Sequence, residues 1–250
     1  MINVKENYRG IFSACTLKVI ACVLMLVDHA SVMFFPQYEW MRIVGRLAYP
    51  LFAYFIAEGC RYTKNKVRRF LSVFILSVVC ELFYIIFSGE YYGNILLTFS
   101  ISILLIYLLQ YTKKAFVLST KKGVLLTAVF SLCVVMVYVF CEHIGVDYGF
   151  FGVMAPVFVI LPDDASKNAK DTYNRVYKRV LSLGFFAGGL VLLSFVDPPI
   201  DCQVWSLWSI VLLAFYNGER GRYNLKYGFY LFYPLHMVVL EGIYMLCYNY

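Results

Sequence analysis

The sequence predicts an all-α fold, a polytopic membrane bundle of about nine transmembrane segments. Of the 250 residues, 62% are hydrophobic and 15% are charged, and the mean hydropathy is +0.72. A soluble domain is about 45–50% apolar and about 25% charged. Apolar runs of membrane-spanning length recur along the whole chain. We therefore expect a multi-pass protein of the cell (plasma or inner) membrane, surrounded by the lipid bilayer.

Nine apolar runs approach the length of about 17–25 residues that a spanning helix needs. They are residues 12–34, 41–60, 70–88, 93–111, 123–141, 148–161, 180–196, 203–216 and 227–247. The sixth and the eighth are short, so we expect them to be tilted or partly re-entrant. No internal repeat and no soluble segment is visible. Residues 1–250 are therefore expected to form a single transmembrane domain.

The charged residues predict an N-in, C-out orientation. Lysines and arginines gather in the second, fourth, sixth and eighth connections, around residues 61–69, 113–122, 167–179 and 220–226. Cytoplasmic loops are enriched in such residues. The alternate connections carry acids: Glu39, Glu90, Glu142, Asp147, Asp197 and Asp201. The net charge of +7 follows from this placement, so no nucleic-acid partner is expected.

The cysteines do not predict a metal site. There are eight of them, none in a Cys-x-x-Cys pair or a Cys/His cluster. Structural zinc sites use such spacings. We expect no metal cofactor.

Asp28 and His29 are adjacent ionisable residues inside the first predicted span. A charged side chain at the centre of a span costs about 2.5–3.5 kcal/mol on insertion scales. Histidine titrates near neutral pH and is a common general base. Lys18 precedes His29 by eleven residues, about three turns of a helix, so both share one face. Lys18 either reaches the inner interface or has a functional role, and His29 alone would also fit a packing role.

Arg42 and Arg46 lie at the outer start of the second span, where the positive-inside rule does not account for them. Their four-residue spacing places them on one helix face. They either pair with Asp28 or hold an anionic group of a substrate or an oxyanion. Gly45 permits close helix approach. Pro50 predicts a kink.

Several further polar residues lie within or near predicted spans. Glu58 is near the cytoplasmic face and fits a pair with Arg61. Asn94 and Thr98 are four residues apart, as helix–helix hydrogen-bonding residues often are. His236 follows Pro234 in the last span and, with Tyr233, lines a cavity or serves packing.

At these residues the chain resembles the TraX family of integral-membrane acetyltransferases. The matching pieces are Leu17–Ala21, Met25–His29, Arg42–Phe52, Glu58–Gly59, Asn94–Thr98 and Tyr233–His236. The family's namesake is similar to an enzyme that N-acetylates conjugative pilin. The family also resembles wider transmembrane acyltransferases, in which a basic residue of the first helix is followed, after ten intervening residues, by a histidine. Lys18 and His29 fit that spacing, with lysine in place of the usual arginine.

The resemblance implies one acyltransferase-like domain over residues 1–250 that moves acetyl from acetyl-CoA to an amine or hydroxyl of a protein, peptide or glycan acceptor. His29 is then the general base and Asp28 orients it. The residues expected to bind the acceptor or the oxyanion are Arg42, Arg46, Asn94, Thr98, Tyr233 and His236. Those expected to bind CoA are Lys18, Glu58, Arg61, Arg68 and Arg69. The alternatives are a proton-coupled transporter or flippase, since intramembrane acids and histidines also relay protons, and a non-catalytic assembly factor.

Overall fold

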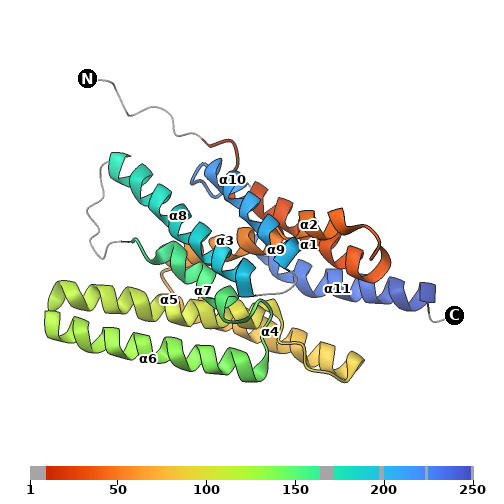
Figure 1. Ribbon diagram of the computed structural model, residues 1–250, viewed down its shortest axis with the longest axis horizontal. Helices are drawn as coiled ribbons and strands as arrows, with labels where there is room; N and C mark the ends of the chain where they lie inside the picture. Colours follow the sequence, from red (N-terminus) through yellow and green to blue (C-terminus); the bar gives the residue numbers. More distant parts are fainter. Residues whose placement is uncertain (1–9, 164–171, 197–199, 223–224, 249–250) are drawn as a thin grey trace. The chain divides into compact units, whose positions relative to one another are not determined.

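A computed structural model describes residues 10–163, 172–196, 200–222 and 225–248 (Figure 1). In this part of the chain every regular element is helical, apart from one isolated bridge between Phe12 and Tyr216. Six helices are long and apolar enough to cross a membrane. They are α1 (Ala14–Phe34), α4 (Lys66–Ser88), α5 (Ile95–Leu118), α6 (Thr120–Ile144), α8 (Thr172–Val196) and α11 (Lys226–Tyr248). The all-helical membrane fold is confirmed, whereas the nine spans and their orientation stay predictions.

The expected run 41–60 is divided into two helices, α2 (Glu39–Gly45) and α3 (Ala48–Tyr62). The break falls at Arg46 and Leu47, and Pro50 lies in the first turn of α3. Proline has no N–H for the carbonyl four residues earlier. In this chain that carbonyl belongs to Arg46, so the continuous helix is lost there instead of being kinked at Pro50.

The two short runs are also helical. The sixth is α7 (Gly149–Ile160). The eighth is the succession α9 (Ile200–Gln203), η1 (Val204–Trp208) and α10 (Ser209–Ala214), in which η1 is a 3₁₀ helix. Each is shorter than an ordinary spanning helix needs to be.

The chain forms two compact units. The first comprises the described residues of 53–193, and the second comprises the described residues of 10–52 and 194–248. The helix α3 begins in the second unit and ends in the first.

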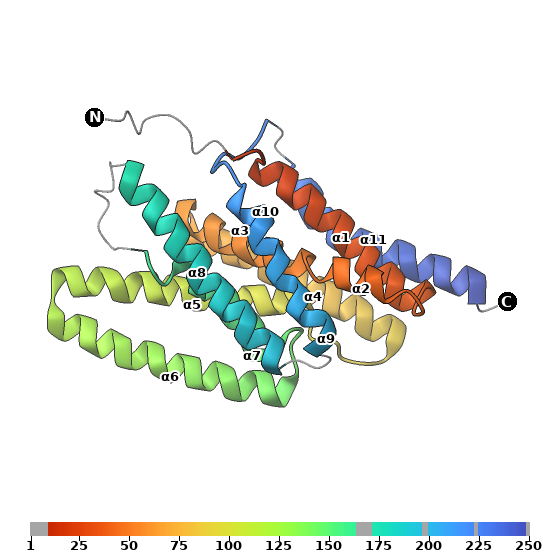
Figure 2. The ribbon, with the colours of Figure 1, turned by 45° about the horizontal axis from the view of Figure 1, so that its top comes forward.

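In the first unit, α5 is the central helix and packs against α4, α6 and α7. Figure 2 shows α5 and α6 as neighbouring antiparallel helices joined by a tight turn. Ser102 Oγ donates to the Val153 carbonyl of α7 over 2.8 Å, and Thr98 Oγ1 donates to the Asp147 carbonyl over 2.7 Å. These buried hydroxyls fix α7 and the residue that precedes its first turn against α5.

In the second unit, α1 packs against α2 and α11. The Lys18 Nζ lies 5.8 Å from the centre of the Phe229 ring, and farther along both helices the Phe34 and Tyr244 rings are 6.1 Å apart. Residue numbers rise together along this contact, so α1 and α11 run in the same direction. Their neighbouring course is visible in Figures 1 and 2.

Candidate functional site

Asp28 lies on the buried face of α1, together with Leu17, Ala21 and Met25. These residues recur every three or four positions, which is the spacing of one helix face. Asp28 is 9% exposed. His29 is rotated from it by about 100° around the helix axis, because an α-helix has 3.6 residues per turn. The two neighbours in sequence therefore face different helices.

Asp28 faces α2, where it forms an ion pair with Arg42. Arg42 Nη1 donates to Asp28 Oδ1 over 2.8 Å. The side chain of Asp28 is 12% exposed and that of Arg42 is 29% exposed. The sequence allowed this pair as one of two roles for Arg42, and the structure brings the two side chains together.

Gly45 allows α2 to approach α1 closely. A Cβ atom at position 45 would lie 2.4 Å from Asp28 Cβ and 2.6 Å from Asp28 Oδ1. Any larger residue would therefore displace either the carboxylate or the helix. The glycine and the ion pair belong to the same helix contact.

His29 faces α11, where its partner is His236. His29 Nδ1 and His236 Nε2 are 2.8 Å apart, and His236 Nδ1 lies 2.9 Å from the carbonyl oxygen of Phe232. His236 is 5% exposed. The ring of Tyr233 meets His236 edge-on at 5.6 Å. Two of the residues expected to bind the acceptor or the oxyanion thus lie near His29. His236 contacts His29, and Tyr233 contacts His236.

Arg46 follows α2 and contacts the short helices that precede α11. Its Nη1 donates to Gln203 Oε1 over 3.3 Å. The second unit thus gathers Asp28, His29, Arg42, Arg46 and His236.

Three polar residues of this region were missed in the sequence. They are Gln203, Ser206 and Ser209, each buried. In the described part of the chain, Gln203 Nε2 and the two serine hydroxyls have no hydrogen-bond partner. The three-residue spacing could have pointed to them, because side chains at i and i+3 align in a 3₁₀ helix.

Lys18 lies over the Phe229 ring of α11, one end of the same helix contact that carries His29 and His236. A cation over an aromatic face is favourable. Lys18 and His29 therefore share the face of α1 that meets α11, as their spacing predicts.

Asn94 and Thr98 belong to the first unit. Asn94 caps α5, because its Oδ1 accepts from the backbone of Leu96 and Leu97. Its Nδ2 donates to Glu81, whose carboxylate also accepts from the backbone N–H groups of residues 92–94. Thr98 binds the Asp147 carbonyl. Both residues thus have structural partners within their own unit.

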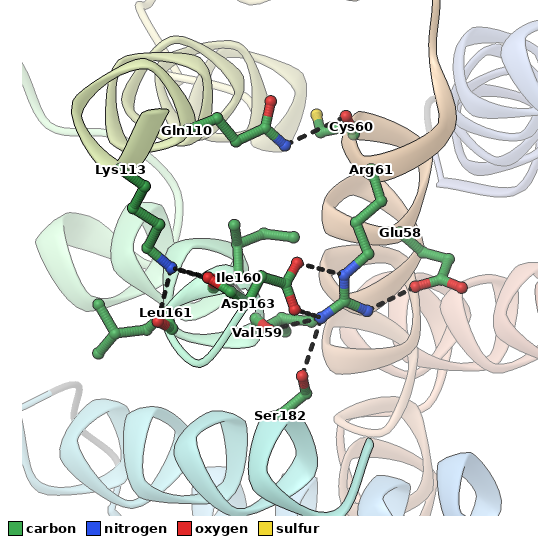
Figure 3. Close-up of polar contacts among 10 residues, drawn as sticks. All are labelled: Glu58, Cys60, Arg61, Gln110, Lys113, Val159, Ile160, Leu161, Asp163 and Ser182. Carbon is green, nitrogen blue, oxygen red and sulfur yellow. Dashed lines mark hydrogen bonds and ion pairs between the residues drawn. The ribbon is translucent and has the colours of Figure 1, made fainter. Parts of the chain in front are cut away.

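Arg61 also lies in the first unit, where its guanidinium joins α3, α7 and α8 (Figure 3). It binds Asp163 through two hydrogen bonds of 2.7 and 2.9 Å, and Glu58 through one of 2.7 Å. It also donates to the Val159 carbonyl and to Ser182 Oγ, each over 2.8 Å. All five hydrogen bonds go to groups of the protein itself.

Lys113 stands beside this cluster in Figure 3 and closes the end of α7. Its Nζ donates to the carbonyls of Ile160, Leu161 and Asp163 over 2.7–2.9 Å. A cation at the C-terminus of a helix is favourable because the last carbonyls lack partners within the helix. Arg61 and Lys113 thus both anchor the end of α7.

The other residues expected to bind CoA differ in exposure. Arg69 Nη2 donates to the Ile56 carbonyl over 3.1 Å, and its guanidinium packs against Gly59. Arg68 is exposed, as is its neighbour Lys64. Exposed basic residues remain available to a phosphate, whereas Arg69 is partly enclosed.

Comparison with known proteins identifies the family. The family model described as TraX protein matches residues 13–244. The chain is 26% identical to a protein of Dichelobacter nodosus named "Probable fimbrial assembly protein FimC, serogroup H1", over 92% of this chain and 94% of that protein. It is 21% identical to an uncharacterized protein of Rickettsia prowazekii, over 98% and 96%.

The likeness to Protein TraX of Escherichia coli is more local. It amounts to 31% identity over 90 residues, which is 34% of this chain and 36% of that protein. No solved structure matches the chain. Because the family model covers almost all of it, the chain belongs to the TraX family.

Proposed function

We propose that this protein is an integral-membrane acetyltransferase of the cell membrane, which moves acetyl from acetyl-CoA to an amine or hydroxyl acceptor. The observation that carries the proposal is the contact of His29 with His236 between two apolar helices, beside the ion pair of Arg42 and Asp28. Ionisable groups inside a membrane span are functional by default, because they are costly to keep there. Membership of the TraX family directs this chemistry toward acetyl transfer.

In the proposed reaction His29 is the general base. It takes the proton of the acceptor as the acceptor nitrogen or oxygen bonds to the carbonyl carbon of the thioester. The carbon–sulfur bond then breaks, and His29 returns the same proton to the departing sulfur, so the enzyme ends unchanged. Arg42, held by Asp28, donates to the oxyanion that forms between these steps. In this scheme the residue that Asp28 orients is Arg42, and not His29.

The acceptor class is proposed from the relatives. One relative is named as a fimbrial assembly protein, and TraX is the namesake of the family. We take the amine of a pilus or fimbrial subunit as the first acceptor to test. Peptides and cell-surface glycans follow.

The proposed CoA site uses exposed cations for the phosphates. Lys64 and Arg68 are exposed, while Arg61 is fully engaged within the first unit. Lys18, which shares a helix face with His29, is a separate candidate for donor binding within the second unit. The attraction between these exposed cations and the CoA phosphates should weaken as the salt concentration increases.

The direction of α1 and α11 supports the proposed topology. Two parallel helices cross the membrane in the same sense, so the segment from α1 to α11, both included, crosses an odd number of times. The described residues contain six long apolar helices, which is an even number. If the α2–α3 pair, α7 and the α9–α10 succession also cross, the number becomes nine. An N-in orientation then gives a C-out end, in agreement with the basic loops.

The experiment is an acetyl-transfer assay with purified protein in lipid nanodiscs and acetyl-labelled CoA, with and without a pilin peptide. His29→Ala should lower transfer by about 10²–10⁴-fold, the usual contribution of a general base. The matched control is His143→Ala, because His143 is exposed at the end of α6. Activity of His29→Ala within a few-fold of the wild type would reject His29 as the base.

A proton-coupled transporter or flippase is the second candidate, favoured by the same intramembrane ionisable residues. It predicts no transfer and no thioester hydrolysis by the purified protein. It predicts instead proton movement in proteoliposomes that His29→Ala abolishes. The two assays use the same preparation and therefore decide between the candidates.

A further inference from the structure

Two hydrogen bonds in series connect the His29 ring to the backbone of α11. The first joins His29 Nδ1 and His236 Nε2 over 2.8 Å. The second joins His236 Nδ1 and the carbonyl oxygen of Phe232 over 2.9 Å. This series of hydrogen bonds therefore ends on the Phe232 carbonyl, a group that can only accept.

That group determines where the protons lie. A carbonyl oxygen only accepts hydrogen bonds, so His236 Nδ1 carries the proton. In a neutral ring the other nitrogen, Nε2, is then an acceptor. His29 Nδ1 must donate to it, which leaves Nε2 of a neutral His29 as an unprotonated base.

The geometry of the two rings fits a linear hydrogen bond between these two nitrogens. Their planes are within 8° of parallel, and their centres are 5.0 Å apart. Each nitrogen lies about half a ring width from the centre of its own ring. The 2.8 Å between the nitrogens is shorter than the 5.0 Å between the ring centres by about one ring width, so both nitrogens lie close to the line that joins the centres. An N–H of one ring then points along the in-plane lone pair of the other, which is the favourable geometry.

The aromatic side chains of α11 hold His236 in place. The Phe232 ring is within 6° of parallel to it, and the Tyr233 ring meets it edge-on. His236 is also almost fully buried. Its orientation is therefore set by packing before any substrate binds.

We propose that His236 is a positioning residue that fixes the Nδ1–H tautomer of His29 and thereby presents His29 Nε2 as the proton acceptor. This inference rests on the proposed acetyl transfer for its purpose. During transfer, Nε2 takes the acceptor's proton, the ring becomes an imidazolium, and its Nδ1–H keeps donating to His236. Nε2 then returns the proton to the sulfur of the leaving thiol.

His236 takes the role that the sequence suggested for Asp28. Neighbouring residues on a helix do not face each other. Asp28 accordingly pairs with Arg42 on α2, while His29 turns toward α11. The residue that orients the base therefore comes from the other end of the chain.

The direct test is the tautomer itself. The chain has three histidines, so ¹⁵N-histidine labelling in lipid bilayers gives three rings, and single substitutions assign them by solid-state NMR. His29 should show a protonated Nδ1 and an unprotonated Nε2, and His236 a protonated Nδ1. A protonated Nε2 on His29 in the wild-type protein would overturn the proposal. This readout needs no acetyl transfer, so it is independent of the proposed function.

Two variants of His236 test its role as a positioning residue. Both replace the imidazole by an amide, at the end of a longer side chain in one variant and of a shorter side chain in the other. The amide of His236→Gln reaches the position of Nε2, whereas that of His236→Asn reaches only the position of Nδ1. The glutamine variant should keep the His29 tautomer and most of kcat. The asparagine variant should lose the tautomer and lower kcat by about 10²-fold or more, with KM little changed.

The outcomes separate the two proposals. If both variants keep the His29 tautomer, His236 has only a packing role and the inference is wrong. If the tautomers behave as expected but the wild type transfers no acetyl group, the inference about His236 holds and the proposed function fails. His143→Gln is the matched control, because His143 is exposed and binds only its own helix through the Val139 carbonyl.

Discussion

Asp28 on α1 and Arg42 on α2 form an ion pair with a separation of 2.8 Å between Oδ1 and Nη1. Both side chains are largely removed from solvent, and the pair lies beside the close approach of α1 and α2 at Gly45. The pair therefore couples the position of the Arg42 guanidinium to the packing of the two helices.

Arg42→Ala should destabilise the protein, because it leaves the Asp28 carboxylate buried without its cation. Removing one partner of a buried pair costs about 3–5 kcal/mol. The double variant Asp28→Leu with Arg42→Met removes both charges and should recover most of that stability, yet transfer no acetyl. Thermal unfolding in detergent and the transfer assay measure the two effects separately. Equal stability of Arg42→Ala and the wild type would show that the pair contributes little.

Gly45→Ala should weaken the contact between α1 and α2, since its Cβ would overlap Asp28. Overpacking of this kind costs about 1–3 kcal/mol. The matched control is Gly184→Ala in α8, where a Cβ would meet nothing within 4 Å. Because alanine is the better helix former, the control should be neutral or stabilising. Unfolding temperatures that change alike in both variants would argue against the close approach at Gly45.

Arg61 should behave as a structural residue of the first unit. Arg61→Ala leaves the carboxylates of Glu58 and Asp163 without their cation, and these side chains are only 13% and 27% exposed. The substitution should lower the free energy of unfolding by about 3–5 kcal/mol. Arg61→Lys keeps the charge but loses the planar fork, so it should also be less stable. Exposed Arg68 is the control, and Arg68→Ala should change stability by no more than about 0.5 kcal/mol.

The same variants test the CoA site. Arg68→Ala should raise KM for acetyl-CoA, most visibly at low salt, whereas Arg61→Lys should leave KM unchanged in the fraction that remains folded. A raised KM in Arg61→Lys at unchanged stability would return Arg61 to the CoA site.

The topology can be measured with single cysteines at positions 91 and 121, in a chain whose eight native cysteines are replaced. These native thiols are free, so no disulfide is lost. Both new positions are exposed. A membrane-impermeant maleimide should label position 91 in intact cells and position 121 only after permeabilisation. Labelling of both from one side would end the proposed nine-span arrangement.

The sequence by itself determined the class of protein and the approximate positions of its helices. Apolar run 123–141 lies within α6, run 93–111 overlaps α5, and the short runs 148–161 and 203–216 overlap α7 and the α9–α10 succession. These features are readable because hydrophobicity and helix length are properties of contiguous residues. The TraX resemblance, carried by Asp28, His29, Arg42 and Arg46, is confirmed for the same reason, since motifs are local in sequence.

Only the tertiary structure decided which polar side chains meet. His29 and His236 are 207 residues apart, and Arg61 and Asp163 are 102 apart. No local pattern specifies such pairs, because the partner of a buried polar group depends on which helix faces it. Adjacent Asp28 and His29 suggested a catalytic pair, but the rotation of about 100° per residue directs them to different helices. The sequence assigns the carbonyl that Pro50 leaves without a partner to Arg46, but whether the helix kinks or ends there depends on the surrounding helices.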